Sequence, residues 1–157
     1  MKALLNDEPA LAWKRAVGIE GRDPDSPAAR EAAAAVRRSA RVEALLAGCD
    51  REASPYKKWN GRHWVIAILS DLGCPPGDES LRPLVDAALD CWLSKNHEKY
   101  IRQIAGRVRR CASQEGYAAW SALRLGFADS RVDELVSRLL KWQWPDGGWN
   151  CDKRRSG

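Results

Sequence analysis

The sequence predicts an all-α protein built from consecutive helical hairpins, and three observations carry this prediction. Apolar residues recur at helical spacing along most of the 157 residues, as at Leu81, Leu84 and Val85. Segments rich in Gly and Pro, such as 73–77, separate these stretches at turns. No segment shows the apolar–polar alternation bounded by turns that is typical of a strand.

Two helices are expected in the N-terminal third of the chain. Pro9 favours a first helical turn, and the helix expected over 11–17 ends at a glycine. Ser26 and Pro27 open a longer, Ala-rich helix expected over 28–47, because Ala has a high helix propensity and Ser is a good N-terminal cap.

Five further helices are expected in the rest of the chain. Asp78 or Ser80 caps the second of them, and Ser130 caps the last. The expected helices cover 61–72, 81–92, 99–105, 113–125 and 131–142, of which 99–105 has the weakest pattern.

This part of the chain also repeats. Two helices end in Leu-Gly, at Gly73 and Gly126, and each is followed by an acidic turn and a second amphipathic helix. The two glycines are 53 residues apart. Glycine-centred joints recur at similar intervals, at Gly61, Gly106 and Gly147. Periods of this size indicate stacked helix pairs, none of which buries its apolar face alone.

The second repeat ends in the most specific motif of the chain, in which Gln143 is followed by Asp146, Gly147, Gly148 and Trp149. The glycines permit a sharp reversal of the chain out of the preceding helix. We expect the Gln143 amide to hold free backbone groups of a neighbouring helix end, with the Trp149 ring stacked on it. Asp146 is placed to cap a following helix. All of these roles are structural.

With this motif, the chain from about Tyr56 to Asp152 resembles the prenyltransferase and squalene-cyclase repeat of terpenoid cyclases and protein prenyltransferase β-subunits. The resemblance implies an α/α toroid, of which residues 51–157 form two repeats behind an N-terminal helical extension, residues 1–50. It also implies an isoprenoid or another apolar molecule as substrate or ligand. A full toroid has more repeats, so we expect either a homodimer or further C-terminal repeats to complete this one.

An enzyme of this kind would be a terpene cyclase, similar to the squalene–hopene isomerases, or a prenyltransferase. The cyclases protonate their substrate with an Asp from a DxDD stretch, which is not found in this sequence. The prenyltransferases hold zinc with Asp, Cys and His, and Cys151 and Asp152 have no His nearby. We therefore predict no metal site and no cofactor, and expect the chain alone to be inactive. The alternative is a non-catalytic helical-repeat module that binds a protein partner or an apolar ligand.

Seven residues are candidates for lining a cavity or binding an anion. Three arginines precede a helix start and can grip a diphosphate or carboxylate, unless one of them pairs with Glu115. Two aromatic residues would line the inner wall of a toroid, where they stabilise carbocations, although their spacing also suits a core. His63 can act as an acid or base, although a hydrogen-bonded structural role is more common; His97 is expected at the surface. The candidates are Arg107, Arg109, Arg110, Tyr117, Trp120, His63 and Trp64.

Composition limits the partners of the chain. There are 26 basic and 21 acidic residues, and the basic runs lack the interleaved aromatic residues typical of nucleic-acid binding, so no nucleic acid is expected. No stretch approaches the roughly 18 apolar residues that span a bilayer, which leaves peripheral contact as the closest association with a membrane. The five cysteines lack metal-ligand spacing and are expected to be free thiols, which favours a cytoplasmic location.

Overall fold

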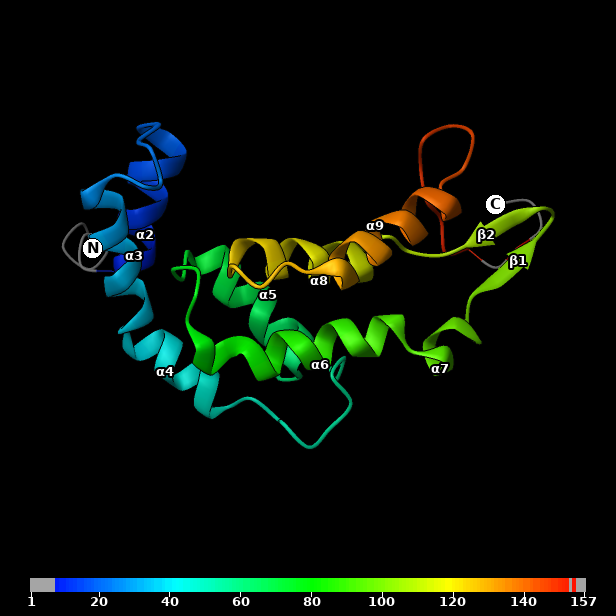
Figure 1. Cartoon of the computed structure of the whole chain (residues 1–157), viewed down its shortest axis with the longest axis horizontal. Coiled ribbons are helices and arrows are strands. Elements are labelled where there is room, and N and C mark those ends of the chain that lie inside the picture. Colours follow the sequence, from blue (N-terminus) through cyan, green and yellow to red (C-terminus); the bar gives the residue numbers. More distant parts are fainter. Residues whose placement is uncertain (1–7, 153, 155–157) are drawn as a thin grey trace.

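The computed structural model describes residues 8–152 and 154, and within them the chain is mostly helical (Figure 1). The N-terminal helices are α2 (Pro9–Lys14), continued by a π-helical turn (Arg15–Ile19), α3 (Pro27–Arg37) and α4 (Ala40–Ala47). The later helices are α5 (Arg62–Leu72), α6 (Arg82–Leu93), α7 (Lys95–Glu98), α8 (Ser113–Arg124) and α9 (Ser130–Trp142). A 3-10 turn (Glu79–Leu81) precedes α6, and two strands, β1 (Arg102–Ile104) and β2 (Arg107–Arg109), lie between α7 and α8.

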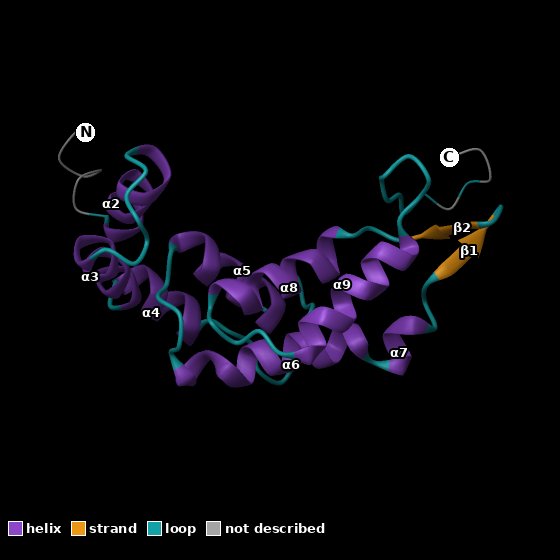
Figure 2. Cartoon of the chain, turned by 45° about the horizontal axis from the view of Figure 1, so that its top comes forward, coloured by secondary structure: helices purple, strands orange, loops and turns teal. Residues whose placement is uncertain are grey.

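Two helical hairpins form the centre of the molecule. Helices α5 and α6 pack together as the first hairpin, and α8 and α9 as the second hairpin. Helix α8 contacts both α5 and α6, while α9 contacts α6, so the hairpins lie against one another (Figure 2). Arg131 at the start of α9 strengthens this contact, because its guanidinium bonds Asp90 on α6 at 2.9 Å. The largest fully buried apolar side chains come from both hairpins and include Ile66, Leu69, Leu84, Leu89, Leu125 and Leu135.

The first helix of each hairpin ends in the same way. Gly73 and Gly126 have φ angles of +89° and +78°, a left-handed conformation that glycine adopts without strain. The N–H of the next residue then bonds back into the helix, from Cys74 to the Leu69 carbonyl and from Phe127 to the Ala122 carbonyl. These are the bonds of a Schellman motif. The predicted Leu-Gly helix ends, 53 residues apart, are confirmed.

An aspartate also marks the entry to the second helix of each hairpin, although Asp78 caps the 3-10 turn that precedes α6 and Asp129 caps α9 itself. The Oδ1 atom of Asp78 accepts a hydrogen bond from the Ser80 N–H at 3.0 Å, and Oδ1 of Asp129 accepts one from the Arg131 N–H at 2.9 Å. The two aspartates are 51 residues apart. Both hairpins therefore share a pair of local signals, a glycine that ends the first helix and a capping aspartate in the turn that leads into the second.

The segment 99–105 was expected to be a helix, and this prediction was wrong. It contains β1, which pairs antiparallel with β2. Ala105 and Gly106, with φ angles of +53° and +74°, form the turn between the strands. Two consecutive residues with positive φ are the turn that joins tightly paired strands, and they cannot continue a helix. The all-α expectation holds for the described residues apart from this short pair.

The long helix expected over 28–47 is two helices. The Ser39 hydroxyl accepts a hydrogen bond from the Val42 N–H at 3.3 Å and so caps the start of α4. High Ala content favours a helix on both sides of this point but does not prevent a capping serine from starting a new one.

The N-terminal helices lie at one end of the molecule, and the β-strands lie at the other (Figure 1). Trp13 packs so closely on Gly73 that an added Cβ would lie 2.4 Å from its ring. The Arg124 guanidinium, at the end of α8, lies 5.3 Å from the centre of the same ring. Trp13 therefore joins the N-terminal helices to the ends of both α5 and α8.

Candidate functional site

Glu115, in the first turn of α8, is a completely buried acid. Its Oε1 atom accepts a hydrogen bond from Arg110 Nε at 2.7 Å and lies 2.8 Å from His97 Nε2. Burial on its own would raise the pKa of the carboxyl group, but the hydrogen bonds from His97 and Arg110 outweigh it and lower that pKa. The charged carboxylate therefore joins α7 to the segment that precedes α8.

His63, in the first turn of α5, is 2% exposed and accepts a hydrogen bond at Nδ1 from Trp92 Nε1, at 3.1 Å. An indole N–H can only donate, so this bond requires an unprotonated Nδ1. Burial lowers the pKa of His63 to about 4, against the opposing influence of the Glu115 charge. His63 is thus a neutral, hydrogen-bonded structural histidine, the alternative that the sequence favoured.

Aromatic rings surround His63. Tyr56 lies 5.2 Å from the His63 ring and 5.4 Å from the half-buried Trp64 ring, measured between ring centres. The exposed ring of Trp59 lies 5.2 Å from Trp64. Trp92 links His63 to His97, because its ring also meets the His97 ring edge-on, with centres 4.8 Å apart. The predicted cavity candidates His63 and Trp64 therefore lie in one packed cluster, where solvent barely reaches His63.

The three arginines do not act as one group. Arg107 and Arg109 lie over the ring of Trp144, with their guanidinium carbons 4.9 and 4.8 Å from its centre. Arg110 instead forms the ion pair with Glu115, as the structural alternative anticipated. Arg107 is the exposed member of the three. The anion-binding hypothesis stays a prediction, and Arg107 is the arginine best placed to serve it.

The motif at 143–149 forms a compact turn. Gly147 has a φ of +85°, as the reversal requires. The Gln143 side-chain amide donates to the Gly147 carbonyl at 2.7 Å, within the turn, whereas we expected it to reach a neighbouring helix end. The Asp146 carboxylate accepts from the Gly148 N–H at 2.9 Å and so closes the turn.

Two indole groups attach this turn to the body of the molecule. Trp149 Nε1 donates to the Leu139 carbonyl at 2.8 Å, which satisfies an acceptor in the last turns of α9. Trp144 Nε1 donates to the Val108 carbonyl of β2, also at 2.8 Å. The motif thus has a structural role, joining the end of α9 to β2.

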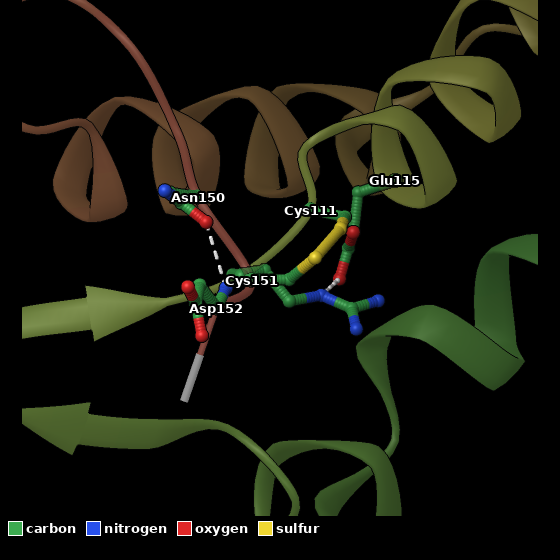
Figure 3. The surroundings of a disulfide bond; sticks show 6 residues. Cys111, Glu115, Asn150, Cys151 and Asp152 are labelled. Atoms are coloured by element: carbon green, nitrogen blue, oxygen red, sulfur yellow. Dashed lines mark hydrogen bonds and ion pairs between the residues drawn. A yellow bond between two sulfur atoms is a disulfide. The ribbon is translucent and has the colours of Figure 1, made fainter. Parts of the chain in front are cut away.

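The segment after the turn is joined to the start of α8 by a disulfide between Cys111 and Cys151 (Figure 3). Their Cα atoms are 5.0 Å apart, within the usual range for such a bond. Beside it, Asn150 Oδ1 accepts a hydrogen bond from the Asp152 N–H at 2.7 Å. Cys49, Cys74 and Cys91 are free, as predicted, but the prediction of free thiols was wrong for Cys111 and Cys151, because the number and spacing of cysteines do not show which two meet in the fold. The argument for a cytoplasmic location rested on those thiols and loses its basis.

The two aromatic candidates on α8 lie at the surface. Tyr117 and Trp120 are exposed, and their rings meet edge-on with centres 5.8 Å apart. They form one wall of a shallow groove of about 330 Å³. The groove is lined by Asp71, Ser113, Gly116, Tyr117 and Trp120. Among these lining residues the only ionisable acid is Asp71, and none is basic.

Comparisons of the chain with protein-family models, with curated proteins and with solved structures found no match. In the described part of the chain, no group of three or more His, Cys, Asp or Glu side chains is arranged to hold a metal ion. None of the helices in that part is long and apolar enough to cross a membrane.

Sequence reasoning missed the role of two residues. His97 was expected at the surface, but its side chain is nearly buried against Glu115. Glu115 was considered only as a partner for an arginine. An acid in the first turn of a helix ordinarily faces solvent near the helix dipole, so no local signal distinguishes a buried one. The pairing with His97 is a tertiary contact across the β-strands.

Proposed function

We propose that this chain is a two-repeat segment of an α/α toroid, similar to those of terpene cyclases and protein prenyltransferases, and that it binds an isoprenoid or another apolar molecule. Two features support the architecture. The hairpins share the same helix-ending glycine and helix-starting aspartate, and they pack side by side. The second hairpin then ends in the Gln143–Trp149 turn that carries the resemblance.

The groove on α8 is the observation that carries ligand binding. Tyr117 and Trp120 expose two aromatic faces, whereas the other large rings of the described residues, apart from Trp59 and Tyr100, are buried or half-buried. Exposed aromatic rings beside a groove are favourable for an extended apolar molecule, because each ring offers a large area to be removed from water. Gly116 adds to the opening, because no atom lies within 4 Å of where its Cβ would be.

The proposed role is binding, with catalytic groups supplied from elsewhere. His63 and Glu115 are buried ionisable residues, and both are engaged in hydrogen bonds beneath the surface. Asp71 is exposed at the rim of the groove. It forms an ion pair with Lys14 at 2.8 Å.

Calorimetric titration of the purified chain with farnesol tests this proposal. Trp120→Ala and Tyr117→Ala should each weaken farnesol binding about ten-fold, because each removes an apolar wall of the groove. Farnesyl diphosphate should bind no more tightly than farnesol, because no basic side chain lines the groove.

Matched controls come from exposed aromatic residues elsewhere in the chain. Trp59→Ala and Tyr100→Ala remove the same side-chain types outside the groove and should leave farnesol binding unchanged. Equal losses in the control and groove variants would reject the groove as the binding site. Failure of farnesol to bind at all would reject the ligand class and favour the alternative, in which the chain binds a protein partner.

A further inference from the structure

The first helices of the two hairpins differ in burial at equivalent positions. Counted from the glycines that end them, Trp120 and Leu123 on α8 correspond to Ala67 and Ser70 on α5, each pair 53 residues apart. Ala67 and Ser70 are buried, whereas Trp120 and Leu123 are exposed. The same side of the first helix is therefore buried in the first hairpin and exposed in the second, where it carries larger apolar side chains.

The second helices show the same difference. Counted from the capping aspartates, Val136 and Leu140 on α9 correspond to Val85 and Leu89 on α6, each pair 51 residues apart. Val85 and Leu89 are both 0% exposed, whereas Val136 is 42% and Leu140 is 63% exposed. We call the four exposed residues, Trp120, Leu123, Val136 and Leu140, the uncovered face.

The first hairpin is packed against another hairpin. The second hairpin packs against α5 and α6. The N-terminal helices cannot fulfil this role for the second hairpin, because they attach through Trp13 at the ends of α5 and α8 and leave the uncovered face exposed. By this correspondence with the first hairpin, the natural occupant of the uncovered face is another helical hairpin.

Charges along α9 favour a second copy of the same helix in the opposite direction. Asp133 near its start and Lys141 near its end flank the uncovered face, and neither has an ion-pair partner among the described residues. A twofold axis near Ser137 would place Asp133 of one copy beside Lys141 of the other. The same axis would bring Val136 of each copy beside Leu140 of the other. A symmetric contact of this kind is the commonest way in which identical chains associate.

We propose that the uncovered face is an interface at which two copies of this chain pack, with their α9 helices antiparallel. The interface goes beyond the ligand binding proposed above and does not rest on it. It uses Trp120 and Leu123, which continue along α8 the face that lines the groove, together with the exposed side of α9, and of the groove residues it shares Trp120.

Sedimentation equilibrium of the whole chain without ligand tests the proposal. The expected mass is twice the 17.5 kDa of one chain. Leu140→Asp should raise the dimer dissociation constant by at least about ten-fold, because it places an uncompensated charge in an apolar contact. Ile19→Asp is the matched control, because Ile19 is exposed on the N-terminal segment, and this variant should remain dimeric.

A charge exchange tests the antiparallel arrangement. Asp133→Lys and Lys141→Asp should each weaken the dimer, because each places like charges together across the axis. The double variant should return the dissociation constant toward that of the original chain. A monomer at all concentrations, a Leu140→Asp variant that dimerises normally, or a double variant weaker than both single ones would overturn the proposal. Because no ligand is present, these outcomes are independent of whether farnesol binds.

Discussion

The two hairpins are built from the same pattern but differ in what surrounds them. Each has a glycine that ends its first helix and a capping aspartate in the turn that leads into its second. In the first hairpin, the side formed by Val85 and Leu89 is fully buried. In the second, the corresponding residues Val136 and Leu140 are exposed, and a buried charge lies instead at Glu115. Shared local signals thus specify the hairpin, while neighbouring segments decide which residues become core.

The comparison is sharpest at one pair of positions. Arg62 and Glu115 are 53 residues apart, each near the start of the first helix of its hairpin. Arg62 is half-buried and donates a hydrogen bond to the Ala53 carbonyl at 2.7 Å. Glu115 is fully buried and bonds two side chains. The same helical position is a loop anchor in one hairpin and a buried ionic centre in the other.

The largest effect is therefore expected from Glu115→Ala. It removes the partner of Arg110 and His97 and leaves a nearly buried cation unpaired, which should lower the free energy of unfolding by about 3 to 5 kcal/mol. Arg62→Ala, the equivalent change in the first hairpin, should lower it by about 1 kcal/mol, because it removes a single hydrogen bond. Urea unfolding followed by circular dichroism measures both. Similar losses in the two variants would show that the ionic centre does not matter more than the loop anchor.

The next effect compares covered and uncovered apolar residues. Leu89→Ala should lower the free energy of unfolding by about 3 kcal/mol, because it leaves a cavity in a fully buried site. Leu140→Ala, at the equivalent exposed position, should change it by less than about 0.5 kcal/mol in dilute solution, where copies are separate. When the same urea titration is repeated at high protein concentration, the loss in free energy of unfolding should become larger for Leu140→Ala. It should stay the same for Leu89→Ala. No dependence on concentration would argue against the proposed dimer.

Much of the fold could be predicted from the sequence because its signals are local. The Leu-Gly ends at Gly73 and Gly126 and the capping role of Asp78 follow from residue types at fixed helical positions. The errors also have local causes. Ser39 started a new helix inside an Ala-rich run, and Ala105 took a positive φ that its residue type does not announce.

The candidate site was harder to predict because it depends on contacts between distant segments. Glu115 meets His97 across the two strands, and Cys111 meets Cys151 across α8 and α9. Neither pairing leaves a periodic trace in the sequence. Tyr117 was proposed for an inner wall, and the structure places it at an exposed groove. Enclosure of that groove by further repeats stays a prediction.

A smaller effect, dependent on pH, is expected from His63, whose equivalent in the second hairpin is Gly116. The pKa of His63 is about 4 in the folded chain against an ordinary value of 6.5, because burial disfavours the charged ring. Between these values the unfolded chain binds a proton that the folded chain does not, so stability falls as the pH falls from 6.5 toward 4. From pH 7 to pH 5 the loss should be about 2 kcal/mol.

Urea unfolding of His63→Gln at both pH values isolates this contribution. Glutamine can still accept a hydrogen bond from Trp92 but does not titrate, so the difference between pH 7 and pH 5 should shrink by about 2 kcal/mol. The lowered pKa of Glu115 keeps its own contribution below this pH window. An unchanged pH dependence in His63→Gln would mean that His63 is not the group responsible.

The last comparison is between the two helix-ending glycines, Gly73 and Gly126. Gly126→Ala should cost about 1 to 2 kcal/mol, because alanine is strained at positive φ and its Cβ would lie 3.0 Å from Pro76. Gly73→Ala should cost more, because its Cβ would lie 2.4 Å from the Trp13 ring, which would have to move. In a Trp13→Ala background this excess should disappear, and the two glycine substitutions should then cost about the same. An excess that persists without Trp13 would place its origin in the hairpin itself and not in the N-terminal helix that packs on it.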